Sequence, residues 1–203
     1  MFKKLNKQKS NKGFTLVELL VTISMFVIVT GVVLVNSNKF SSTILLNNFA
    51  YDVALTIKQA QSYGVNVREC ISGSFNSPFG VYFDITTPAG KTNFVLFNDF
   101  DNSSTTALVT SCSTASECIQ KYSMTRGTYI KSMCAGENEA NCQIADQLSI
   151  LFRRPDPSAQ IYYKFGTNPL SLPQSYAKIV LSAPDNATST VIITSVGQIY
   201  VKK

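Results

Sequence analysis

The most unusual setting for a chemically active side chain in this 203-residue sequence is that of Glu18. It is the only charged residue between Lys12 and Lys39, inside a largely apolar run. A lone carboxylate is costly in hydrocarbon unless it takes up a proton or meets a cation, and acids in such segments usually serve a function. The sequence therefore predicts that Glu18 has a cationic partner.

Most common catalytic chemistries lack the residues that they need. The sequence contains no histidine, which excludes Ser-His-Asp and Cys-His nucleophilic sites and every histidine-ligated metal. No pair of acidic residues has a spacing that favours acid–base catalysis. We therefore expect a protein that is not an enzyme and that needs no cofactor.

The cysteines are the next reactive group, and there are five: Cys70, Cys112, Cys118, Cys134 and Cys142. Disulfides are expected if this part of the chain is exported. Proximity in the sequence favours the pairs Cys112–Cys118 and Cys134–Cys142, which leaves Cys70 unpaired, but a crossed pairing stays open. The spacings are wider than those of C-x₂₋₄-C zinc pairs, so we expect no metal site.

Two weaker clusters of polar residues were considered as binding sites. Residues 98–103 have the oxygen density of a calcium loop, but they lack the glycine and the closing glutamate of the EF-hand pattern. A solvated turn is the better interpretation, because Asp and Asn are common turn residues. A small anion or DNA contact could be formed by four basic residues: Arg153, Arg154, Lys202 and Lys203. Nucleic-acid binding usually needs more clustered cations, so we regard DNA as the weaker hypothesis.

The formal net charge of +6 belongs to the amino terminus and not to the whole chain. The first 12 residues contain no acid and five lysines: Lys3, Lys4, Lys7, Lys9 and Lys12. Residues 14–203 hold the other 13 basic residues and all 12 acidic ones, a net charge of +1. This distribution does not describe a uniformly basic nucleic-acid binder.

An apolar segment, residues 14–35, follows the basic start. As a helix it would be about 33 Å long, which is enough to cross a bilayer core. A cleaved secretory signal explains the basic start, but its apolar region is usually only ~7–15 residues long and ends at an A-x-A-like site, which residues 36–38 do not offer. An uncleaved signal anchor explains the length and the lysines but gives Glu18 no purpose.

Residues 12–20 read Lys-Gly-Phe-Thr-Leu-Val-Glu-Leu-Leu and resemble the type IV prepilin processing site, G-F-T-L-x-E-L-L. The resemblance implies that prepilin peptidase cleaves between Gly13 and Phe14 and that the new Phe14 amine is N-methylated. It also implies that Glu18, at the fifth position after the cut, meets the amino terminus of a neighbouring subunit during assembly. Ala50–Arg68 and Ile192–Ile199 resemble the GspH/FimT branch of the family.

This resemblance implies a structural subunit, a minor pilin or pseudopilin, of a type IV pilus or a type II secretion pseudopilus. The implied partners are other pilin subunits, prepilin peptidase, the membrane and the inner-membrane assembly platform. The chain would cross the cell membrane once, with an exported carboxy-terminal head, and would then enter the filament. Two alternatives stay open: a DNA-binding tip pilin, and a membrane-anchored exported protein of unknown activity.

Hydrophobic periodicity predicts that the helix continues to Gly64, a natural helix stop. Apolar residues recur at helical spacing on one face: Leu46, Phe49, Ala50, Val53, Ile57 and Ala60. Beyond Gly64 the period changes to two. Strands are predicted at 79–85, 93–97, 148–153, 160–165, 177–182, 190–194 and 198–201, with a hairpin between the first two.

The predicted fold class is α+β, with a long N-terminal α-helix packed on a β-rich antiparallel head. Residues 101–146 are polar and weakly patterned, and we expect a loop-rich insertion there. The expected organisation is a basic leader (1–13), the transmembrane and assembly half of the helix (14–38), the amphipathic half of the helix (39–64) and the head (65–203).

Overall fold

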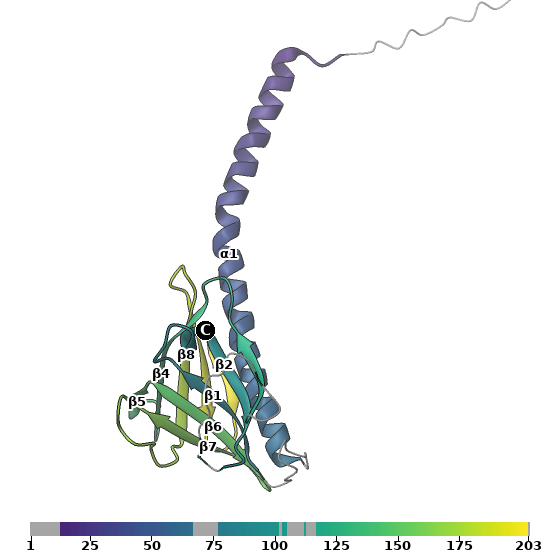
Figure 1. Ribbon diagram of the computed structural model, residues 1–203. Coiled ribbons are helices and arrows are strands. Elements are labelled where there is room, and N and C mark those ends of the chain that lie inside the picture. Colours follow the sequence, from purple (N-terminus) through teal and green to yellow (C-terminus); the bar gives the residue numbers. More distant parts are fainter. Residues whose placement is uncertain (1–12, 67–76, 102, 105–111, 113–116, 203) are drawn as a thin grey trace, which may run out of the picture. The chain divides into compact units, whose positions relative to one another are not determined.

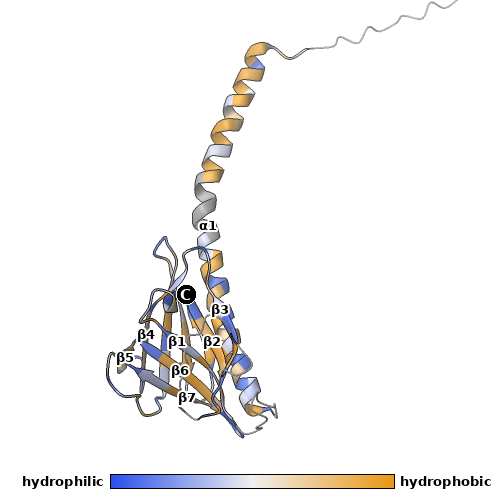
Figure 2. Ribbon diagram, viewed as in Figure 1, coloured by the Kyte–Doolittle hydropathy of each residue, from blue (hydrophilic) through white to orange (hydrophobic). Residues whose placement is uncertain are grey.

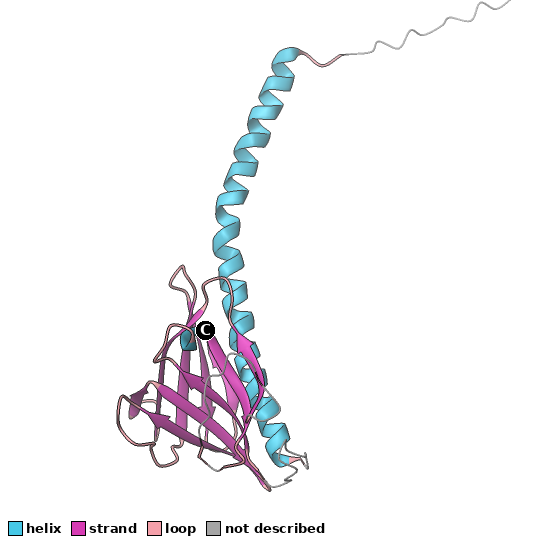
Figure 3. Cartoon of the chain, viewed as in Figure 1, coloured by secondary structure: helices cyan, strands magenta, loops and turns pink. Residues whose placement is uncertain are grey.

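The computed structural model describes residues 13–66, 77–101, 103–104, 112 and 117–202. The chain divides into two units, Met1–Ser41 and Ser42–Lys203. The described residues form one α-helix, α1 (Leu16–Val65), and a set of β-strands (Figure 1 and Figure 3). The helix agrees with the predicted bounds to within two residues at each end.

The strands form two five-stranded sheets, in which every neighbouring pair is antiparallel. The first sheet has the order β3-β2-β1-β6-β7 and the second the order β10-β9-β8-β4-β5. This arrangement confirms the predicted α+β class. The strands are β1 (Phe79–Asp84), β2 (Asn93–Asn98), β3 (Cys118–Ser123), β4 (Tyr129–Gly136), β5 (Cys142–Ala145), β6 (Gln147–Arg153), β7 (Asp156–Lys164), β8 (Tyr176–Ser182), β9 (Thr188–Thr194) and β10 (Ile199–Lys202).

The predicted hairpin is confirmed by the pairing of β1 with β2, which a short 3₁₀ turn, Gly90–Thr92, connects. Val81 and Phe83 alternate with Tyr82 along β1, so they face opposite sides of the first sheet. Val81 and Phe83 belong to the main core, and Tyr82 belongs to a smaller apolar cluster on the other face. Both faces of this strand are therefore covered.

The main core lies between α1 and the two sheets. One face of the second half of α1 is buried, and Ala50, Val53 and Ile57 are fully inaccessible there. They share one cluster with residues of both sheets: Phe83, Phe94, Leu96, Ile130, Met133, Ile179 and Val191. The periodicity that predicted the helix is thus explained by burial of one stripe.

The last turn of α1 approaches β6 closely at Gly64. A Cβ atom at this position would lie 2.5 Å from the backbone oxygen of Phe152, much closer than any side chain can pack. Glycine is required here for close packing of helix and sheet. Gly64 does not end the helix, which continues to Val65.

The expectation of a loop-rich insertion at 101–146 is wrong for its described part, because that part contains β3, β4 and β5. β3 is an edge strand with a polar exposed side, so its apolar alternation is weak. In β4 the register shifts between Ile130 and Ser132, which breaks the period of two on which the prediction relied. β7 also starts earlier than predicted, because its Pro157 is tolerated on the edge of a sheet.

Candidate processing and assembly site

The backbone around Gly13 and Phe14 is exposed and non-helical. The Phe14 side chain is 75% exposed, and a Cβ atom added at Gly13 would meet no atom within 4 Å. A protease must bind its substrate in an open backbone conformation, and glycine leaves that backbone unobstructed. The bond between these two residues is therefore accessible in the folded chain.

The helix starts with a cap that sequence analysis did not identify. The backbone N–H of Glu18 donates to the Thr15 hydroxyl oxygen over 3.2 Å, and the N–H of Leu19 donates to the Thr15 carbonyl over 3.1 Å. Thr15 is thus the N-cap residue, and Glu18 occupies the third helical position, as in the capping box S/T-x-x-E. The acid also lies at the end of the helix where the macrodipole favours negative charge.

The first part of α1, Leu16–Leu34, is long and apolar enough to cross a membrane, and none of it is buried within the protein. Figure 2 shows most of the ribbon of this stretch in the orange of hydrophobic residues. A stretch of this length and composition fits a membrane anchor.

The polar side chains of Leu16–Leu34 leave one group without a partner. The hydroxyls of Thr22, Ser24 and Thr30 donate to backbone carbonyls one turn earlier, so they are satisfied in an apolar environment. The carboxylate of Glu18 forms no hydrogen bond or ion pair with any residue that the structure describes. A buried environment would therefore require an external partner for it.

Residues 8–34 match the family described as the prokaryotic N-terminal methylation motif. The chain carries a type IV prepilin-type signal. This signal supports a type IV pilin-like precursor, and the matched residues include Gly13, Phe14, Glu18 and most of the apolar segment. Comparison with curated proteins and with solved structures found no match to this chain.

In a pilin-like precursor the exposed apolar helix serves as the membrane anchor, and other pilin subunits and prepilin peptidase are the partners that the signal indicates. The exposure of Leu16–Leu34 fits this role, since lipid or neighbouring helices can cover the whole stretch.

A second exposed apolar surface follows on the same helix and was missed by the sequence analysis. Ile44, Tyr51 and Leu55 are all exposed. Spacings of seven and four residues place them on one face, opposite the buried stripe that contains Val53 and Ile57. We call these three residues the outer stripe of α1.

Both disulfides favoured by proximity are present in the structure. Cys112 is bonded to Cys118, and Cys134 is bonded to Cys142. The second bond joins the neighbouring strands β4 and β5. Cys70 lies outside the described residues.

The structure describes three of the four basic residues of the anion hypothesis, and no two of them share a strand. Arg153 ends β6, and Arg154 follows it. Gly197 lies in the turn between β9 and β10. The Gln61 side chain donates both to the Pro157 carbonyl oxygen, over 2.8 Å, and to the Gly197 carbonyl oxygen, over 3.2 Å, so this turn lies near the start of β7. Lys202 lies at the other end of β10 from this turn. Lys203 lies outside the described residues.

The segment 98–103 is not the fully solvated turn that we expected, because Asp99 is only 1% exposed. One carboxylate oxygen from each of Asp99, Asp101 and Glu117 lies within 4.8 Å of the other two. Sequence analysis missed Glu117, because only the pairing of β2 with β3 brings it to this loop. The backbone N–H of Asn98 donates to the Glu117 carbonyl over 2.8 Å, which fixes the approach.

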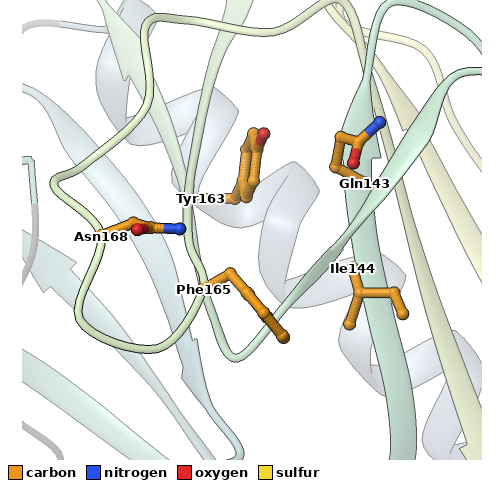
Figure 4. Close-up of a pocket in the computed structure, with 5 residues that line it drawn as sticks. All are labelled: Gln143, Ile144, Tyr163, Phe165 and Asn168. Atoms are coloured by element: carbon orange, nitrogen blue, oxygen red, sulfur yellow. The ribbon is translucent and has the colours of Figure 1, made fainter.

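A small pocket of about 240 Å³ opens beside β5 and β7 (Figure 4). Its lining comprises Gln143, Ile144, Tyr163, Phe165 and Asn168. These residues include no carboxylate, lysine or thiol, so the pocket offers none of the groups that usually act as acid, base or nucleophile. Its geometry gives no support to an enzymatic site.

Proposed function

We propose that this chain is a minor pilin or pseudopilin that is cleaved after Gly13 and assembled, through α1, into a type IV pilus or a type II secretion pseudopilus. The observation that carries the proposal is the methylation motif at the start of a helix that is long and apolar enough to cross a membrane. Its role is structural rather than enzymatic. The resemblance of Ala50–Arg68 and Ile192–Ile199 to the GspH/FimT branch supports a minor subunit over a major one.

Cleavage has a direct physical consequence for Glu18. It creates a free amine on Phe14, and this amine is a cation at the membrane end of the helix. The carboxylate has no partner in its own described chain, so the Phe14 amine of a neighbouring subunit is well suited to pair with it. Such a pair stabilises the assembled state and not the isolated subunit.

The outer stripe of α1 extends the surface available for assembly. Leu55 is 65% exposed, although the residue two positions later, Ile57, is fully buried. Apolar side chains that line up on an exposed helix face favour contact with another protein surface. Helices of neighbouring subunits would cover Ile44, Tyr51 and Leu55 in the filament.

The experiment that tests the proposal is mass spectrometry of the protein from its native host. We expect a mature chain that starts at Phe14 and carries one added methyl group. Gly13→Leu should block cleavage almost completely, because the side chain obstructs the scissile backbone. Gly31→Leu is the matched control, since it is the same change at another open glycine of this segment, and it should be processed normally.

An intact leader on the wild-type protein, in a host with active prepilin peptidase, would contradict the proposal. That result would favour the membrane-anchored exported protein of unknown activity. Normal cleavage of Gly13→Leu would likewise show that the cut lies elsewhere.

A further inference from the structure

Three carboxylates meet where the chain leaves β2 and enters β3. Asp99 and Asp101 follow β2 directly, and Glu117 immediately precedes β3. Antiparallel pairing of the two strands brings these ends together, and one oxygen from each acid lies within 4.8 Å of the others. No part of pilin processing or helix assembly requires this cluster.

The cluster has no internal compensation for its charge. None of the three acids forms an ion pair with a lysine or arginine among the described residues. Three negative charges at this separation repel one another, and the repulsion is strongest where water is excluded. The arrangement is therefore unfavourable unless a cation or a proton occupies it.

The burial of Asp99 is an independent observation that favours a ligand at this position. Its side chain is only 1% exposed, and its Oδ1 atom has no hydrogen-bond partner among the residues that the structure describes. The other oxygen, Oδ2, accepts a bond from the Ser104 N–H over 3.3 Å. An orphaned carboxylate oxygen in such a buried position loses its hydration without replacement, which is costly.

Backbone amides hold the other two acids in place. The Ser103 N–H donates to Asp101 Oδ1 over 2.8 Å, and the Phe100 N–H donates to Glu117 Oε1 over 3.2 Å. One oxygen of each acid is thus used to fix its position within the loop. The carboxylates are arranged before any ligand binds, which lowers the entropy cost of binding.

We propose that Asp99, Asp101 and Glu117 form a binding site for a divalent cation, and that this cation is calcium. The donor set consists of hard oxygen atoms, which suit calcium and magnesium rather than softer transition metals. Calcium is favoured, because it accepts the irregular geometry of carboxylates from two separate loop segments, whereas magnesium requires a nearly ideal octahedron.

The surroundings of each acid shift its pKa. Burial, and after it the charge of Asp101, raises the pKa of the Glu117 carboxyl to about 7. Burial also raises the pKa of Asp99, whereas hydrogen bonds from Ser103 lower the pKa of Asp101.

The test uses the full-length chain, purified in detergent and stripped with a chelator. Titration with CaCl₂ should give saturable heat in calorimetry and a matching rise in Tm, and MgCl₂ should act more weakly. Asp101→Asn and Glu117→Gln should weaken calcium binding by roughly tenfold or more, because each removes one ligand charge. Glu137→Gln is the control, because it removes an exposed acid from another loop and should bind calcium like the wild type.

Two results would overturn the proposal. One is that the wild-type chain shows no saturable binding at calcium concentrations up to roughly 10 mM, which is above the usual dissociation constants of extracellular calcium modules. The other is unchanged binding by both Asp101→Asn and Glu117→Gln, which would place the bound calcium elsewhere. Both substitutions are isosteric, and peptide mapping of the Cys112–Cys118 disulfide under non-reducing conditions checks that the variants are folded.

Discussion

The two halves of α1 differ both in apolar content and in the burial of their side chains. In Leu16–Leu34 no residue is buried. Between Leu46 and Ala60 one stripe is completely buried against the two sheets. The second half therefore stabilises the fold to which it belongs, whereas we propose that lipid or other subunits cover the first half.

This difference also separates two kinds of acid. Glu18 lies in the exposed half and has no partner within the described chain. Glu117 lies in the head, where other acids and backbone amides of the same chain surround it. The partner that we propose for the first acid belongs to another molecule, whereas the second acid can be compensated by an ion or a proton within one molecule.

The largest expected effect compares one substitution in the two halves of the helix. Ile57→Ala should lower the free energy of unfolding by about 2–5 kcal/mol, because it leaves a cavity in the core. Ile28→Ala, at a site that is 67% exposed, should change it by less than about 0.5 kcal/mol. Urea unfolding of the full chain in detergent, followed by tyrosine fluorescence, measures both. Equal losses would show that the first half also packs on the fold.

The sequence predicted most of this fold because the relevant residues alternate or recur regularly. β1 and β2 could be predicted to within a residue, since Val81, Phe83 and Phe94 lie in an uninterrupted period of two. β4 could not, because its register shift displaces the alternation between Ile130 and Ser132. Local pattern is informative only while the strand stays regular.

The candidate site was predictable where a short motif defines it and not where pairing of distant segments forms it. Gly13, Phe14 and Glu18 are recognised within one short stretch of sequence, and the methylation motif covers them. The cap formed by Thr15 also has a local sequence signature, T-x-x-E, at residues 15–18. Glu117 carries no local signal, because its position depends on the antiparallel pairing of β2 with β3.

The second prediction separates the two roles available to Glu18. Glu18→Ala should lower incorporation into sheared filaments by roughly tenfold or more, because it removes the carboxylate that pairs with a neighbouring amine. Glu18→Gln introduces a side chain that is also favoured at the third position of a capping box, but it removes the negative charge. We therefore expect Gln to fail like Ala, and Glu18→Asp to be intermediate.

The measurement is the amount of each variant in the filament fraction relative to its membrane pool. Cleavage, insertion and folding of the head should be unchanged in all three variants. Full incorporation of Glu18→Gln would assign the acid to helix capping and not to pairing between subunits.

The third prediction concerns the outer stripe and has a smaller expected effect. Leu55→Lys should lower incorporation several-fold, because it places a charge on a surface that we expect to be covered in the filament. The stability of the isolated chain should change by less than about 0.5 kcal/mol, since Leu55 is exposed. Leu172→Lys is the matched control, an 82% exposed leucine in the head, and should assemble normally. Equal incorporation of both variants would remove the outer stripe from the interface.

The smallest expected effect is the pH dependence that Glu117 gives to the chelator-treated chain. Its pKa in the folded state is about 7, above the ordinary value of 4.5, so the folded state binds more protons than the unfolded state between these values. The free energy of unfolding should therefore be highest below about pH 4.5 and should fall as the pH rises to about 7, as far as this group contributes. Glu117→Gln should remove that part of the slope, and Glu137→Gln should retain it.

Because calcium would replace the proton as the compensating charge, added CaCl₂ should flatten the wild-type slope without affecting that of Glu117→Gln. A wild-type slope that calcium leaves unchanged would show that the cluster holds a proton and not a metal ion.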